Sequence, residues 1–90
     1  MTKLELAKKI AQETGIETVA VLAVVESFMN NVKESVARGQ RVYLRGFGTF
    51  GSKVRKEKPG RNIAARTTVI IPEHKIPFFK PSNFFKNSVK

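Results

Sequence analysis

The hydrophobic pattern of the chain changes its period near Gly39, and this change limits the fold classes open to it. Before Gly39, apolar residues recur every three or four positions, as they do on one face of a helix. From Arg41 onward, the stretch "RVYLRGFGTFGSKVRK" carries its apolar residues on a strand-like background interrupted by glycines. A helical segment followed by a β segment predicts an α+β fold.

A first helix is expected over residues 2–14. Thr2 and Glu5 have the spacing of a capping box, which satisfies N–H groups left unpaired at the start of a helix. Gly15 is placed to end this helix, because glycine readily adopts the left-handed conformation found at many helix ends.

A second, longer helix is expected to begin at a Thr18 cap and to stop at Gly39. Its apolar positions spread beyond a single narrow stripe, so two of its faces need to be covered. The first helix can cover only one of them.

The β segment predicts a strand, a tight turn at 46–48 and an antiparallel strand that continues into the polar stretch "SKVRKEK". The chain then turns at Pro59 and Gly60 and returns through "TTVIIPEHKIPFFK". Residues 53–76 should therefore form a two-stranded ribbon. Pro72 and Pro77 are expected at edges or bends, because proline cannot donate to a β ladder.

The net charge of +10 is distributed unevenly. Residues 1–37 carry four Lys and five Glu, whereas residues 38–90 carry the other thirteen Lys and Arg and only two Glu. Charge of a single sign destabilises a compact body by self-repulsion, so this segment indicates a polyanionic partner. The alternative is a basic face that serves only solubility.

The chain is too small to bury a large core by itself. A domain of this size buries only about 60% of the surface that its unfolded chain exposes. No Cys is present, so disulfides cannot supplement the core. We therefore expect an obligate dimer, the alternative being a monomer with the ribbon folded onto its body. The rings expected in the shared core are Phe28, Phe47, Phe50, Phe79 and Phe85.

No apolar run approaches the length of a membrane span, and the opening stretch "MTKLELAKKIAQETG" is amphipathic, unlike a signal peptide. The sequence thus predicts a cytoplasmic protein without a membrane partner.

Three stretches, "YLRGFGTF", then "GRN", then "IPFFKPS", resemble the bacterial histone-like HU and integration host factor family of DNA-binding proteins. The resemblance extends over essentially all 90 residues. It implies an intertwined dimer whose two β-ribbon arms embrace double-stranded DNA in the minor groove. It also implies that the protein bends and compacts DNA with low sequence specificity, in the nucleoid. The second chain of the dimer is either an identical copy or a related chain.

The fold expected from the residues and the resemblance together is α+β, in a single 90-residue domain. Its parts are a helical dimerisation base over 1–40, a small antiparallel sheet over 41–52 and 77–81, a protruding β-ribbon arm over 53–76 and a short C-terminal helix over 82–90.

Ile63 stands where most of the family has a proline that inserts between base pairs. An aliphatic side chain inserted at a base step unstacks it and kinks the duplex, which is how HU and integration host factor are known to act. We expect Ile63 to be the DNA-intercalating residue. The alternative is that Ile63 rests against the ribbon or is simply tolerated at the tip. The tip departs from the family again at Ala65 and Arg66, where Thr-Gly is usual, and Asn83 stands where a lysine is common.

Arg61 and Asn62 flank Ile63, and both can donate to minor-groove acceptors. That groove shows nearly the same acceptors for A·T and T·A, so little sequence discrimination follows. The remaining cations of the arm and body are expected to contact phosphates, although alternation along a strand leaves some of them solvated. They are Lys53, Arg55, Lys56, Lys58, Arg66, Lys75, Lys80 and Lys86.

Other functions are less consistent with these residues. The single histidine, His74, lacks the partners of a catalytic or metal site, so we expect no enzyme, metal, cofactor or small-molecule substrate. An RNA-binding basic protein would present rings for stacking, whereas these Phe lie at core positions. Site-specific bending, as by integration host factor, stays open because it depends on the deformability of the DNA.

Overall fold

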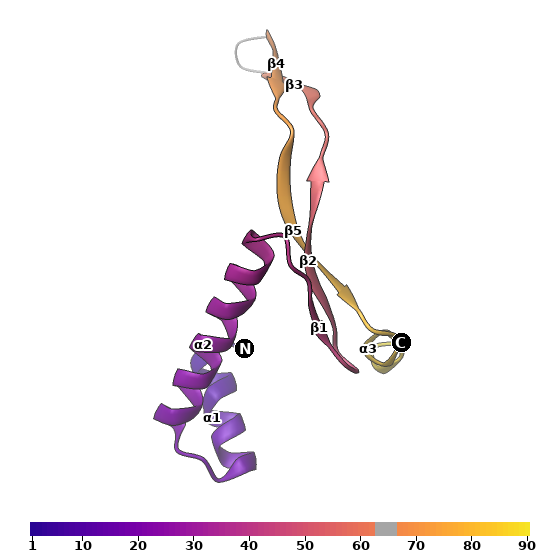
Figure 1. Cartoon of the computed structure of the whole chain (residues 1–90). Coiled ribbons are helices and arrows are strands. Elements are labelled where there is room, and N and C mark those ends of the chain that lie inside the picture. Colours follow the sequence, from indigo (N-terminus) through magenta and orange to yellow (C-terminus); the bar gives the residue numbers. More distant parts are fainter. Residues whose placement is uncertain (63–66) are drawn as a thin grey trace. The chain divides into compact units, whose positions relative to one another are not determined.

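The computed structural model describes residues 1–62 and 67–90, so the expected intercalating residue Ile63 lies outside the described residues. The described chain divides into two compact units, Met1–Glu34 and Ser35–Lys90. The elements in chain order are α1 (Lys3–Thr14), α2 (Thr18–Ala37), β1 (Val42–Leu44), β2 (Gly48–Arg55), β3 (Lys58–Asn62), β4 (Thr67–Ile71), β5 (His74–Pro81) and α3 (Asn83–Ser88) (Figure 1).

Helix α1 has the two ends that its sequence predicts. The Thr2 side chain accepts a hydrogen bond from the Glu5 N–H at 3.2 Å, as an N-cap does. At the other end, Gly15 has a φ of 76°, and its N–H donates to the Ala11 carbonyl at 2.9 Å. Both signals are local, so they could be identified without knowledge of the tertiary structure.

Helix α2 begins one residue earlier than its expected cap. The Glu17 carbonyl accepts from the Val21 N–H at 3.0 Å, which places Glu17 at the N-cap and Thr18 inside the helix. The expectation of a Thr18 cap was therefore wrong by one position.

The end of α2 at Gly39 agrees with the sequence. Gly39 has a φ of 79° and donates to the Val36 carbonyl at 3.0 Å. The Gln40 N–H donates to the Ser35 carbonyl at 2.9 Å, which completes a Schellman motif.

The first unit has very little buried apolar surface. Ala7 and Val21 are the buried apolar side chains among the residues that the structure describes. Val19 and Val24 on α2 are 80% and 68% exposed. An ion pair between Lys3 and Glu26 joins the two helices at the surface, but exposed pairs of this kind contribute little to stability.

The second unit contains an antiparallel three-stranded sheet in the order β1-β2-β5. A tight turn joins β1 to β2, in which the Phe47 N–H donates to the Leu44 carbonyl at 2.9 Å. Gly46 has a φ of 79° at the third position of this turn, a conformation that glycine adopts without strain. The predicted glycine turn is thus confirmed at Gly46, but it spans residues 45–47 rather than 46–48, and Gly48 already belongs to β2.

The predicted ribbon is confirmed for the described residues, and its two ladders share one register. Strand β2 pairs with β5 as far as Arg55 and His74, and β3 pairs with β4 from Lys58 and Ile71. Two residues on each strand separate the two ladders. Because these numbers are equal, there is no β-bulge between the ladders. Pro72 lies in this gap and has no N–H to donate. Figure 1 shows β2 and β5 leading into β3 and β4.

Helix α3 follows β5 directly. The Ser82 side chain accepts from the Phe85 N–H at 3.1 Å, so Ser82 is the predicted N-cap. The Ser82 N–H donates to the Phe47 carbonyl at 2.9 Å, which fixes the start of α3 beside the β1–β2 turn. Among the described helices, none combines the length and the apolar character needed to traverse a bilayer.

Candidate nucleic-acid interface

The register of β1, β2 and β5 assigns each side chain to one of two faces, because residues paired across a ladder point to the same face. One face, here called the aromatic face, carries Val42, Leu44, Phe50, Ser52, Val54, Lys75, Pro77 and Phe79. The opposite face, here called the cationic face, carries Tyr43, Thr49, Gly51, Lys53, Arg55, His74, Ile76, Phe78 and Lys80.

Four of the five expected core rings form one cluster at the aromatic face. The ring centroids of Phe50 and Phe79 are 4.7 Å apart, and Phe47 lies 5.1 Å from Phe79 and 5.4 Å from Phe85. These distances are those of interacting aromatic pairs. Phe28 belongs to the other unit, where it is 44% exposed.

The cationic face collects basic side chains without acidic partners. Lys53 and Arg55 are successive residues of β2 on this face, because Val54 between them points to the other side. Lys80 lies on β5. Arg41 extends this face, because its guanidinium carbon lies 5.9 Å from the centroid of the Phe78 ring. Within the described residues, none of these four cations forms an ion pair with a carboxylate. Their mutual repulsion is therefore uncompensated until an anion binds.

Three other expected phosphate-binding residues do not belong to this face. Lys75 pairs with Val54 and so lies on the aromatic face, and Lys56 lies between the two ladders. Lys86 is on α3.

Residues near the ribbon tip are described only in part. Lys58, Arg61 and Asn62 belong to β3, where they pair with Ile71, Thr68 and Thr67. Arg66, like Ile63, lies outside the described residues.

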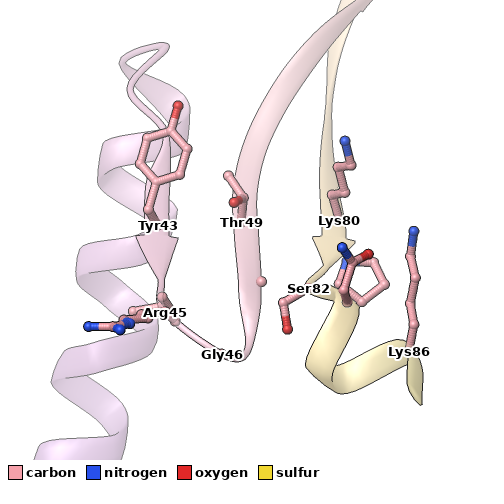
Figure 2. Close-up of a pocket in the computed structure, with 11 residues that line it drawn as sticks. Tyr43, Arg45, Gly46, Thr49, Lys80, Ser82 and Lys86 are labelled. Carbon is pink, nitrogen blue, oxygen red and sulfur yellow. The ribbon is translucent and has the colours of Figure 1, made fainter. Parts of the chain in front are cut away.

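A hollow of about 500 Å³ opens beside the β1–β2 turn. Its lining includes three cations, Arg45, Lys80 and Lys86, together with Tyr43 and Thr49 (Figure 2). The hollow is therefore a basic depression at one end of the cationic face.

Sequence reasoning missed three residues of this region: Arg41, Tyr43 and Arg45. The signal was present in "RVYLR", where polar residues alternate with Val42 and Leu44. Such alternation places Arg41 and Tyr43 on the face opposite the apolar residues, whereas Arg45 lies in the turn that follows β1.

Comparison with known proteins agrees with this architecture. The family model described as "Bacterial DNA-binding protein" matches residues 1–90. DNA-binding protein HU of Thermus thermophilus is 37% identical over all of this chain and 93% of its own length. Integration host factor subunit alpha of Actinobacillus pleuropneumoniae is 30% identical over all of this chain and 92% of its own length.

Among solved structures, an Anabaena HU–DNA cocrystal structure matches with a TM-score of 0.96 and 31% identity, covering 99% of this chain and 97% of that one. The resemblance noted in the sequence is thereby confirmed. The chain belongs to the bacterial DNA-binding protein family that includes HU and integration host factor.

Proposed function

We propose that this chain is an architectural protein that binds double-stranded DNA as a dimer and bends it. The observation that carries the proposal is the cationic face, on which Lys53, Arg55 and Lys80 have no acidic partner in the described residues. A duplex presents closely spaced phosphates, and neutralising them releases counterions, which drives binding. The relatives named DNA-binding protein HU and the Anabaena HU crystallised with DNA support the same partner.

The apolar side chains left exposed support the dimer. On α2, Val24 is 68% exposed and Phe28 is 44% exposed, although both belong to its apolar pattern. In the second unit, Phe47 and Phe79 remain 44% and 36% exposed within the ring cluster. Each Å² of apolar surface removed from water contributes about 25 cal/mol, so a second chain that covers these side chains supplies the core that one chain lacks.

In the proposed mode of binding, the ribbon arms follow the minor groove. Arg61 and Asn62 donate to base edges there, and Ile63 enters a base step and kinks the duplex, as is known for HU and integration host factor. Sequence specificity is low, because the minor groove distinguishes little beyond A·T from G·C. The cations of the arm and body hold the bent duplex through its phosphates.

This function is one of binding rather than catalysis, and it places the protein in the bacterial nucleoid. The single histidine, His74, has its Nδ1 2.9 Å from the Pro72 carbonyl, and no carboxylate orients the ring in the described residues. A catalytic pair would require a nucleophile or a carboxylate within hydrogen-bond reach of the imidazole, whereas its partner in the described residues is the Pro72 carbonyl.

A titration of the whole protein with fluorescently labelled duplexes tests the proposal. A random duplex and a duplex with a flexible central step are each titrated at two salt concentrations, and bending is measured by energy transfer between their ends. We expect similar affinities for both duplexes, increased energy transfer on binding, and an affinity that falls with salt by about 0.9 logarithmic units per phosphate neutralised.

The same titration separates the alternatives. Strong preference for the flexible site would indicate a site-specific bending factor, a function favoured by the 30% identity to an integration host factor subunit. Displacement of the duplex by equimolar structured RNA would indicate an RNA-binding protein instead. A salt-independent affinity would contradict a phosphate-driven interface altogether.

A further inference from the structure

Tyr43 is an aromatic residue in an unusual place on this molecule. Its side chain is 71% exposed on β1, whereas the rings of Phe47, Phe50, Phe79 and Phe85 gather at the aromatic face. The hydroxyl group of Tyr43 makes no hydrogen bond within the part of the chain that the structure describes. The ring therefore contributes little to the fold.

The neighbours of Tyr43 are polar and cationic. Tyr43 pairs with Thr49, which pairs in turn with Lys80, so the three side chains form one row across the cationic face. Figure 2 shows them on adjacent strands, with Lys86 of α3 beyond Lys80. All four line the basic hollow beside the β1–β2 turn.

We propose that Tyr43 is a contact residue for the backbone of duplex DNA: its hydroxyl donates a hydrogen bond to a phosphate oxygen, and its ring packs against the adjoining deoxyribose. The inference rests on the proposed function and adds an uncharged residue to that interface. Tyrosine suits this place because it combines a large apolar body with a polar tip at a low cost in conformational entropy. Hydroxyl donors are common partners of DNA phosphates.

The alternative chemistry is base stacking on a single strand, and the structure favours it less. Stacking surfaces of sheets carry two or three exposed rings in a row. The other aromatic residue on the cationic face, Phe78, is partly buried. One side of its ring lies so close to Gly51 that a Cβ there would be 2.9 Å from Phe78 Cζ, and Arg41 lies 5.9 Å from the ring centroid. Of these two rings, only that of Tyr43 is therefore open to a ligand. The imidazole of His74 is exposed on the same face, but it pairs with Arg55 at the far end of β5 and so does not extend a row of rings from Tyr43.

Three variants of the full chain test the inference: Tyr43→Phe, Tyr43→Ala and, for contrast, Lys80→Gln. Affinity for a random duplex is measured for each over a range of salt concentrations. Tyr43→Phe is expected to weaken binding by about three- to tenfold for each copy in contact, the equivalent of one hydrogen bond. Its salt dependence should equal that of the unchanged protein, because a neutral donor releases no counterion. Lys80→Gln should weaken binding and also reduce the salt slope by about 0.9 per copy.

The outcomes separate the possibilities. If Tyr43→Phe binds duplex as tightly as the unchanged protein, the hydroxyl contact is refuted, whether or not Tyr43→Ala weakens binding. Loss of single-strand affinity in Tyr43→Ala but not in Tyr43→Phe would assign the ring to stacking instead and would also overturn the proposal. Thermal unfolding of each variant checks the fold, which should be unchanged at so exposed a position. If the unchanged protein fails to bind duplex, the proposed function itself fails.

Discussion

The backbone of Gly48 lies directly against the ring of Phe79. A Cβ at position 48 would come within 2.5 Å of Phe79 Cζ and within 2.6 Å of the Lys80 carbonyl oxygen. The ring of Phe79 belongs to the aromatic cluster, and the Lys80 carbonyl belongs to strand β5. Both neighbours are therefore held in place by the rest of the sheet.

Gly48→Ala should accordingly destabilise the protein, and Gly51→Ala is its matched control. At Gly51 a Cβ would meet only side chains, with Phe78 Cζ at 2.9 Å and Arg41 Cγ at 3.4 Å, and these can rotate away. We expect Gly48→Ala to lower the free energy of unfolding by about 1–3 kcal/mol, the usual cost of overpacking, and Gly51→Ala by less. Urea unfolding at one fixed protein concentration measures both. If both variants lose the same free energy of unfolding, or if Gly51→Ala loses more, the fixed Lys80 carbonyl beside Gly48 is not what makes that position intolerant of a Cβ.

Local signals in the sequence were sufficient to predict where most of the helices begin and end. The Thr2–Glu5 capping box, the stops at Gly15 and Gly39 and the Ser82 cap each involve residues within one turn of helix, so tertiary contacts are not needed to recognise them. The Thr18 cap was wrong because the preference for Thr over Glu at an N-cap is weaker than the interactions that start the helix at Thr18, where the Glu17 carbonyl accepts the first helical hydrogen bond.

The composition of the two sheet faces was not predictable in the same way. Alternation divides a strand into two sets of residues, but the register between β2 and β5 decides which sets lie together. Lys75 and Lys53 were therefore both expected at phosphates, although the register places them on opposite faces. The contact between Arg41 and Phe78 joins distant parts of the chain and leaves no local signal.

This separation of faces can be tested with single charge removals on the ribbon. Lys53→Gln removes a cation from the cationic face, and Lys75→Gln removes one from the aromatic face. If the cationic face is the one that meets DNA, Lys53→Gln should reduce the salt slope of binding by about 0.9 per copy, and Lys75→Gln should change it much less. Binding isotherms at several salt concentrations give both slopes. Equal reductions would mean that the duplex contacts both faces of the ribbon.

The cap of helix α3 gives a further prediction. Ser82→Ala removes the acceptor for the Phe85 N–H, whose distance from the Ser82 hydroxyl oxygen is 3.1 Å. The free energy of unfolding should fall by about 1 kcal/mol. Ser82→Thr keeps a hydroxyl acceptor and should lose much less. If Ser82→Ala unfolds at the same urea concentration as the unchanged protein, the cap contributes nothing measurable.

The dimer makes stability depend on concentration. The melting temperature of the unchanged protein should rise with protein concentration, because association is coupled to folding. Phe28→Asp places a carboxylate on the exposed apolar face of α2 and should abolish the dimer, whereas Phe28→Leu should preserve it, since burying an unpaired charge costs far more than a change of apolar shape. Sedimentation velocity distinguishes the two variants. A dimeric Phe28→Asp protein would exclude Phe28 from the shared core.

The last prediction concerns Ile63, whose expected role comes from its sequence position after Gly-Arg-Asn. If its side chain enters a base step, Ile63→Ala should reduce the bend of the bound duplex, because a methyl group is too small to replace a displaced base-stacking contact. Ile63→Leu should preserve the bend, since leucine is also used as a wedge in kinked complexes. Energy transfer across a duplex labelled at both ends gives the bend, and the same titration gives the affinity. The salt slope should be equal in both variants, because neither changes the number of cations at phosphates. An unchanged bend with Ile63→Ala would remove intercalation from the mechanism and leave the cations alone to hold the duplex.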